Sequence, residues 1–497
     1  MEENASNINL KEIKSNTISG FLWNSIDQGG NYVIHFLFGI FTVRILDPED
    51  YGLFGLISIF IALSVVFIDS GLGTVLIQRK NTNNSDFDTV FWFNVVVGII
   101  LFLIFFLLAP LISKFYNEPK IINLIRVISL LFLLISLSST FNTFLTKNLE
   151  FKKLALINLS NSFFFGTTTL TYAILGFKYW SLVYGYISAG IITLILNFLF
   201  SSWKPKLYFS IGKFKNMYKD SIYLFIQNII NTFTNNLNKV IIGKRFNTIT
   251  LGFYDRSNQL ELYFSKTFGL IINKTILPNL IELNDNNNLL RNSFKIILNI
   301  ITFISFFIAS LLFINSKEII IILFTEKWLL SAKYFNILMI SAGFYPLIYL
   351  YRNILLIKNQ NRNLLIIELR NFIIYLILII SASFYSVELI LWAQNLYVLI
   401  LMIFYSNNIK KTIQLNYIEQ INVFLKSIYI IFISVALCLI LKNFLNFNVF
   451  LNLIIISIIF IFLVIIFSEI LKNQAYLEIK QILINYLNAI FKLNLKL

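Results

Sequence analysis

The chain has 497 residues, of which 58% are hydrophobic and 13% charged, and its formal net charge is +16. This composition excludes a soluble domain and is typical of an integral membrane protein with many spans. The positive charge lies mostly in short loops, so it does not indicate a nucleic-acid partner. The only histidine, His35, and the only cysteine, Cys438, are far apart, which argues against a zinc or haem cofactor.

Hydrophobic stretches predict about fourteen membrane-spanning helices, punctuated by glycine, proline, asparagine and charge clusters. They lie near 18–46, 52–77, 90–113, 121–146, 155–176, 179–201, 218–242, 251–281, 294–315, 330–357, 364–385, 387–407, 424–445 and 449–471. Residues 1–17 are polar and lack the apolar core of a signal peptide, which predicts a cytoplasmic tail. Residues 472–497 predict an amphipathic cytoplasmic tail on the membrane surface.

The distribution of lysine and arginine predicts the orientation of the chain. With the N-terminus inside, the cytoplasmic segments hold about 23 of these residues and the outer loops about 11. Because the number of predicted spans is even, both termini are expected in the cytoplasm.

A faint internal repeat predicts two lobes. The segment 44–54 is similar to 245–254, at an offset of about 200 residues, or six spans. We therefore expect six-helix lobes at 18–202 and 218–408, a cytoplasmic linker at 203–217, and two further helices at 424–471.

Polar side chains share one helical face in the first and seventh spans, whereas spans two to six are mostly apolar. In the first span Asn31 and His35 lie on this face with Asp27 beside them, and in the seventh Asn235 and Lys239 do. These residues either bond neighbouring helices or line a cavity. Since Asp27 and His35 can change charge, they are candidates for ion coupling or gating.

The eighth span is too polar to face lipid on all sides. Arg256, Tyr263 and Lys274 fall within about 40° of one another on a helical wheel, and Gln259 and Lys266 flank them. Arg256 and Lys274 could extend to the lipid headgroups, but Lys266 is about 15 Å from either surface. The pattern therefore predicts a cationic cavity for an anionic substrate, with the neighbouring Asp255 as a gating carboxylate.

Several short motifs resemble one known family. The loop Arg44-Ile-Leu-Asp-Pro-Glu-Asp-Tyr-Gly52 is similar to the signature of Wzx-type flippases for lipid-linked oligosaccharides, which belong to the multidrug/oligosaccharidyl-lipid/polysaccharide (MOP) exporter superfamily. Further similar segments follow in order across roughly residues 15 to 420: Asp69-Ser-Gly71, Gln78-Arg79-Lys80, Trp203-Lys-Pro205 and Tyr254-Asp255-Arg256. Asp255 departs from the family, in which asparagine is commoner at this position.

The resemblance implies an all-α, MATE-like membrane protein that is not an enzyme. It would move an undecaprenyl-diphosphate-linked glycan from the cytoplasmic to the periplasmic leaflet of a bacterial inner membrane, for O-antigen, capsule or exopolysaccharide. The expected mode is alternating access with proton or sodium coupling, by a monomer that works beside the polysaccharide polymerase machinery. The cations would bind the diphosphate, and the amides and hydroxyls would bind sugars.

Competing functions predict other sequence features. A small-molecule or drug antiporter of the same superfamily would have a more acidic cavity. A glycan polymerase would carry a long outer loop, whereas every outer loop here has about 15 residues or fewer. A structural scaffold would have no reason to keep charged faces on three membrane helices.

Overall fold

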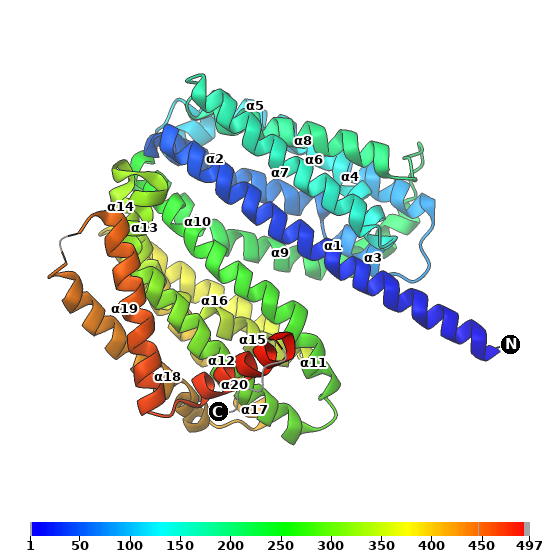
Figure 1. The fold of residues 1–497 in the computed structure, drawn as a ribbon. Helices are drawn as coiled ribbons and strands as arrows, with labels where there is room; N and C mark the ends of the chain where they lie inside the picture. The colour runs from blue at the N-terminus through cyan, green and yellow to red at the C-terminus, as the bar shows by residue number, and fades with distance from the viewer. Residues whose placement is uncertain (1, 446, 492–497) are drawn as a thin grey trace. The chain divides into compact units, whose positions relative to one another are not determined.

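The computed structural model describes residues 2–445 and 447–491, and every regular element within these ranges is a helix (Figure 1). The prediction of an all-helical fold is confirmed. The chain forms two compact units, Met1–Gly252 and Phe253–Leu497, which we describe separately. The predicted lobe boundaries at 203–217 stay a prediction.

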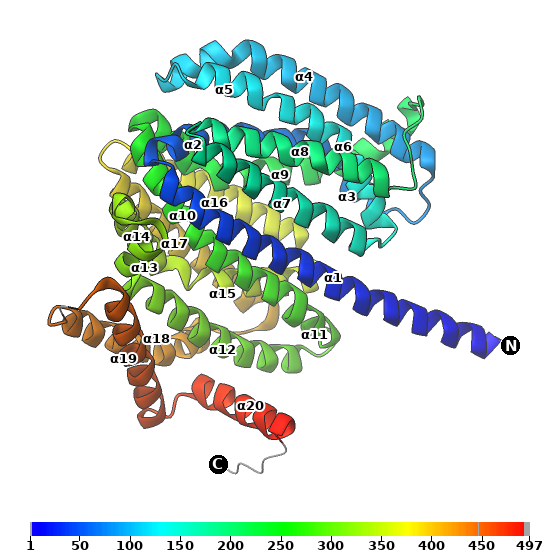
Figure 2. The same ribbon diagram turned by 45° about the horizontal axis from the view of Figure 1, so that its top comes forward.

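The first unit is a bundle in which α1 packs mainly on α7, α7 on α8, and α4 on α6 (Figures 1 and 2). Helix α9 packs on α2, α3 and α4. The helices are α1 (Glu2–Ile45), α2 (Pro48–Asp69), α3 (Leu72–Gln78), α4 (Asn84–Tyr116), α5 (Ile121–Ile128), α6 (Leu130–Lys147), α7 (Phe151–Ile174), α8 (Trp180–Phe200), α9 (Ile211–Arg245) and the start of α10 (Thr248–Ile271).

The second unit contains the rest of α10, then η1 (Ile272–Ile276), α11 (Leu277–Glu282), α12 (Asn287–Ile314), α13 (Ser316–Phe324), η2 (Glu326–Trp328), α14 (Leu329–Ala342), α15 (Tyr345–Ile357), α16 (Asn361–Ala382), α17 (Val387–Ile413), α18 (Tyr417–Lys442), α19 (Val449–Ile470) and α20 (Gln474–Phe491). Helix α12 packs on α14 and α18, and α17 packs on α14, α15 and α16. The amphipathic α20 packs on α12.

Ten helices among the described residues are long and apolar enough to cross a membrane, so the chain is a multi-pass membrane protein. Besides the amphipathic α20, the long helices that fail this test are α1, α7, α9 and α10. All four carry runs of polar side chains, which lowers their mean hydropathy. The number fourteen stays a prediction.

Three helix boundaries differ from the prediction. Helix α1 runs unbroken from Glu2, so it includes the predicted tail. The second span is divided between α2 and α3, because Ser70 and Gly71 take φ values of 47° and 74° that end a helix. Residues 316–324, which were expected to form a loop, make the short helix α13.

The signature loop between α1 and α2 is bonded to two other loops at the same end of the first unit. The carboxylate of Asp50 accepts hydrogen bonds from the backbone N–H of Asp47 (3.0 Å) and of Tyr179 (3.1 Å). Glu49 pairs with Lys120 at 2.6 Å, and this hydrogen bond raises the pKa of Lys120. The motif therefore holds the α1–α2, α4–α5 and α7–α8 loops together and has a structural role.

The opposite end of this unit is fastened through the segment that follows α8. Asp88 accepts hydrogen bonds from the indole N–H of Trp203 (3.1 Å) and the backbone N–H of Lys206 (3.0 Å). Arg79 pairs with Asp220 at 2.9 Å. Two more family-like motifs thus bind α3 and α4 to the segment 201–220.

Gly52 and Gly252, which occupy equivalent positions in the sequence repeat, each pack against the backbone of the other copy. A Cβ atom on Gly52 would lie 1.7 Å from the carbonyl oxygen of Thr248, and one on Gly252 would lie 1.8 Å from the carbonyl oxygen of Pro48. Residues 48 and 52 correspond to 248 and 252 at the offset of the sequence repeat, so each copy of the motif touches the other in the same way. This is the contact expected where two-fold-related segments meet.

This contact predicts that Gly52→Ala and Gly252→Ala each prevent correct folding. No rotamer of a neighbouring side chain relieves a clash with backbone oxygen, so the cost should reach or exceed about 1–3 kcal/mol. Gly39→Ala is the matched control, because its Cβ would meet no atom within 4 Å. Fluorescence-detected size-exclusion chromatography should show aggregated or absent protein for the first two variants and a normal peak for the control. Normal peaks for all three would refute the contact.

Candidate functional site

A buried carboxylate lies between α1 and α7. Asp27 is only 6% exposed. Its two oxygens accept hydrogen bonds from different amides, Oδ1 from Asn31 at 2.6 Å and Oδ2 from Asn158 of α7 at 2.9 Å. The carboxylate therefore accepts a side-chain amide bond at each of its oxygens, one from its own helix and one from α7.

The same cluster continues to the histidine. The hydroxyl of Ser162 donates to the side-chain oxygen of Asn31, and its oxygen lies 3.0 Å from Nε2 of His35. Because Ser162 has one proton and gives it to Asn31, Nε2 of His35 is assigned as the donor of the remaining contact. A chain of hydrogen bonds through Ser162 and Asn31 therefore links His35 to Asp27.

The structure thus brings together Asp27, Asn31 and His35, three of the predicted site residues. Their partners on α7 were missed, because that span was expected to be mostly apolar. The available signal was the spacing of Asn158 and Ser162, four residues apart and hence on one helical face. Among the described residues, no group of three histidine, cysteine, aspartate or glutamate side chains could hold a metal ion.

Helix α10 carries two polar pairs along its predicted face. Arg256 pairs with the adjacent Asp255 at 2.5 Å, and both side chains are largely buried. One turn further on, the amide nitrogen of Gln259 donates to the hydroxyl of Tyr263 at 3.1 Å. The predicted cation Arg256 and the predicted gating acid Asp255 therefore form one ion pair.

Lys266 lies further along α10 and differs from Arg256, because its side chain is exposed. It is five residues from the end of the α-helical segment at Ile271. A charge in the middle of a bilayer costs several kcal/mol unless it meets water or a partner. A watery cavity around Lys266 stays a prediction.

The C-terminal part of the predicted eighth span departs from a regular helix. Residues Ile272–Ile276 form a π-helix, followed by α11 with Pro278 in its first turn. Proline has no N–H, and its ring clashes with the carbonyl four residues earlier, here that of Lys274, so the helix widens. The predicted alignment of Lys274 with Arg256 on a helical wheel requires a regular α-helix throughout. The side chain of Lys274 lies outside the described residues.

The other side of α10 is packed inside the second unit. Ser257 donates to the carbonyl oxygen of Ser331 in α14 at 2.8 Å. Glu261 is 2% exposed, and Ser265 donates a hydrogen bond to it. Helix α10 therefore has a buried face and an exposed face, with Lys266 on the exposed one.

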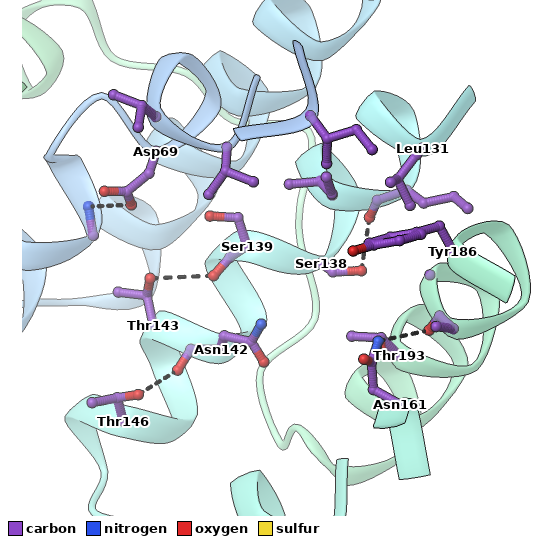
Figure 3. A pocket seen from close by; sticks show the side chains of 18 of the residues that line it. Asp69, Leu131, Ser138, Ser139, Asn142, Thr143, Thr146, Asn161, Tyr186 and Thr193 are labelled. Atoms are coloured by element: carbon purple, nitrogen blue, oxygen red, sulfur yellow. Dashed lines mark hydrogen bonds between the residues drawn. The ribbon is translucent and has the colours of Figure 1, made fainter. Parts of the chain in front are cut away.

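Helix α9 presents its predicted polar face partly to the surface. Asn235 is exposed and Lys239 is half-buried. Asn228, two turns earlier on the same face, lines a pocket inside the first unit. This pocket has a volume of about 680 Å³, and His35 also lines it (Figure 3). Sequence reasoning did not find it, because its walls come from seven separate helices.

Comparison with known proteins identifies relatives of this chain. A family model described as "Polysaccharide biosynthesis protein" matches residues 41–333. The lipopolysaccharide biosynthesis protein WzxC of Escherichia coli is 27% identical over 64% of this chain and 65% of its own length. An uncharacterized membrane protein in the cps region of Klebsiella pneumoniae is 25% identical over 67% of this chain and 69% of its own. The chain thus spans just under two thirds of WzxC.

A solved structure has a similar fold. The lipid II flippase MurJ in an inward closed conformation superposes with a TM-score of 0.74 at 15% identity, covering 91% of this chain and 99% of that one. The fold is therefore shared with a MOP-superfamily transporter, as the motifs predicted.

Proposed function

Since the chain belongs to the polysaccharide biosynthesis protein family, we propose that it is a flippase for polyprenyl-diphosphate-linked oligosaccharides. It would carry the repeat unit of a surface polysaccharide from the cytoplasmic to the outer leaflet of a bacterial cytoplasmic membrane. Both termini then lie in the cytoplasm, as the lysine and arginine distribution predicts. WzxC is named as a lipopolysaccharide biosynthesis protein and MurJ as a lipid II flippase, and both names support a lipid-linked saccharide as the substrate.

The observation that carries the proposal is the exposed cation of α10. Lys266 is exposed on a helix too polar to rank among the ten apolar spans, and it lies about three turns from Arg256 on the same helix. A diphosphate is the densest anion of a lipid-linked glycan and has to cross hydrocarbon. Charge-assisted hydrogen bonds from lysine and arginine stabilise it there.

The remaining parts of the substrate match other groups. The amides and hydroxyls of Asn31, Asn235, Gln259 and Tyr263 are suited to sugar hydroxyls, and Lys239 adds charge. The prenyl chain can remain in lipid while the headgroup passes. Transport then follows from alternating access, in which the site opens to one side of the membrane at a time.

We assign ion coupling to the Asp27–His35 hydrogen-bond chain. Both ends can change charge, and a proton or sodium ion at Asp27 would compete with the amide donors of Asn31 and Asn158. Occupancy would therefore alter the packing of α1 on α7. Asp255 has a separate role in this proposal: it holds Arg256 until the diphosphate displaces it.

Reversing the charges of α10 should abolish transport. The double variant Arg256→Glu, Lys266→Glu would repel a diphosphate, so surface glycan should fall to the level of a deletion strain while the protein stays in the membrane. Glycan is measured by immunoblot and protein by membrane fractionation. Lys266→Arg should retain function, and Arg362→Glu, an exposed cation at the start of α16, is the control for reversal itself. Normal surface glycan in the double variant would refute the site.

Asp27→Asn tests the coupling. This variant keeps the shape and removes the negative charge, so transport in proteoliposomes should lose its response to an imposed proton or sodium gradient. Asp220→Asn, at an exposed ion pair with Arg79, is the control and should respond as the native chain does. If Asp27→Asn remained equally dependent on the gradient, the coupling group would lie elsewhere.

A further inference from the structure

We propose that the pocket inside the first unit binds uncharged sugar rings of the transported glycan, while the diphosphate is held elsewhere. This inference rests on the proposed flippase function and adds a separate subsite to it. The pocket is lined by α1, α2, α3, α6, α7, α8 and α9, all within the first unit.

The size of the pocket suits a short oligosaccharide. Its volume of about 680 Å³ lies within the range of about 300–1,000 Å³ found for small-molecule sites. A packed membrane bundle without a ligand would be expected to close such a space with larger side chains. Two glycines of its wall sit in close contacts that exclude a larger side chain, since a Cβ on Gly190 would lie 2.8 Å from Leu131 and one on Gly73 would lie 2.5 Å from Asp69.

The wall formed by α6 presents hydrogen-bond acceptors. Ser138, Thr143 and Thr146 donate their hydroxyl protons to carbonyls of their own helix, so only their lone pairs remain for a ligand. The side-chain oxygen of Asn142 has no hydrogen-bond partner among the described residues. Figure 3 shows this amide between the α6 wall and the wall that carries Asn161.

The opposite wall is fixed in position by a bond between helices. The amide nitrogen of Asn161 donates to the hydroxyl of Thr193 at 2.8 Å and to the carbonyl of Ala189 at 3.1 Å. Beside it lies the ring of Tyr186, which packs edge-on against Phe165 at 4.8 Å between centroids. Amides, hydroxyls and an aromatic ring are the groups expected around a sugar, which has many hydroxyls and an apolar ring face.

The charged groups around the pocket favour a sugar over a phosphate as its ligand. Among the described residues that line it there is no lysine or arginine, Asp69 contributes a carboxylate, and His35 is a group that can change charge. That carboxylate accepts a hydrogen bond from the backbone of Gly73 at 3.2 Å, which fixes its position at the pocket wall. A diphosphate would meet the like charge of Asp69 without a lysine or arginine to offset it, whereas a sugar hydroxyl can donate to Asp69.

The simpler interpretation is that these polar residues only join helices. It accounts for Asn161, which bridges α7 and α8, and for Asn94, which bonds Thr140 across α4 and α6 outside the pocket. Asn94 and Asn142 each have a side-chain oxygen without a hydrogen-bond partner among the described residues, but Asn94 bonds Thr140 through its nitrogen and lies outside the pocket, whereas Asn142 lines the pocket.

The test compares two lipid probes on the full-length protein in nanodiscs. One probe is undecaprenyl diphosphate alone, and the other is the same lipid carrying the host's own glycan repeat unit. Binding of both is measured for the native chain, for Asn142→Ala and for Asn142→Leu, which fills the space. Asn148→Ala is the matched control, because Asn148 is an exposed asparagine just beyond the end of α6 and does not line the pocket.

The inference predicts that both Asn142 variants lose at least about tenfold in affinity for the glycosylated lipid and bind the bare diphosphate lipid as the native chain does. Native affinities of both variants for the glycosylated lipid would overturn the subsite and leave the flippase proposal intact. Equal losses for both probes would also overturn it, since the effect would not be specific to sugar. Failure of the native chain to bind the glycosylated lipid would defeat the flippase proposal and the subsite with it.

Discussion

A charged side chain in the middle of a membrane must meet water, an opposite charge or a ligand, and the arrangement of α10 follows from this requirement. Arg256 meets an opposite charge, because Asp255 is its neighbour in the chain and pairs with it. Lys266 is exposed instead. The buried side of the same helix bonds α14 through Ser257, so the helix is anchored in the second unit while one cation stays accessible.

The polar groups of the first unit form two sets, one between α1 and α7 and one around the pocket. Those between α1 and α7 are buried or half-buried and bond one another, and they end in two groups that can change charge, Asp27 and His35. Those around the pocket are partly unsatisfied, as the oxygen of Asn142 shows. A satisfied network is suited to holding two helices in a defined packing, and an unsatisfied one is suited to receiving a ligand. We therefore assign coupling to Asp27 and His35 and sugar binding to the pocket, which His35 borders.

Much of the fold could be predicted from the sequence, because membrane helices are long, apolar and punctuated by breakers such as Pro48 and Pro119. The polar face of α1 was predicted from its helical spacing, but its partners on α7 were not, because serine and asparagine were diluted by phenylalanine in that span. The π-helix at Ile272–Ile276 was missed because the effect of Pro278 falls on the preceding turn. The pocket could not be predicted, since helical periodicity says nothing about which faces of distant helices meet.

The central claim is that the exposed face of α10 lies in water within the membrane. A water-soluble thiol reagent measures this directly, since Cys438 is the only cysteine and Cys438→Ser gives a clean background. Cysteines at Lys266 and at Phe462, an exposed residue of the apolar helix α19, would be compared for rate of labelling. The account predicts rapid labelling at 266, slowed by the lipid-linked glycan, and negligible labelling at 462. Labelling at 266 as slow as at 462, in folded protein, would contradict it.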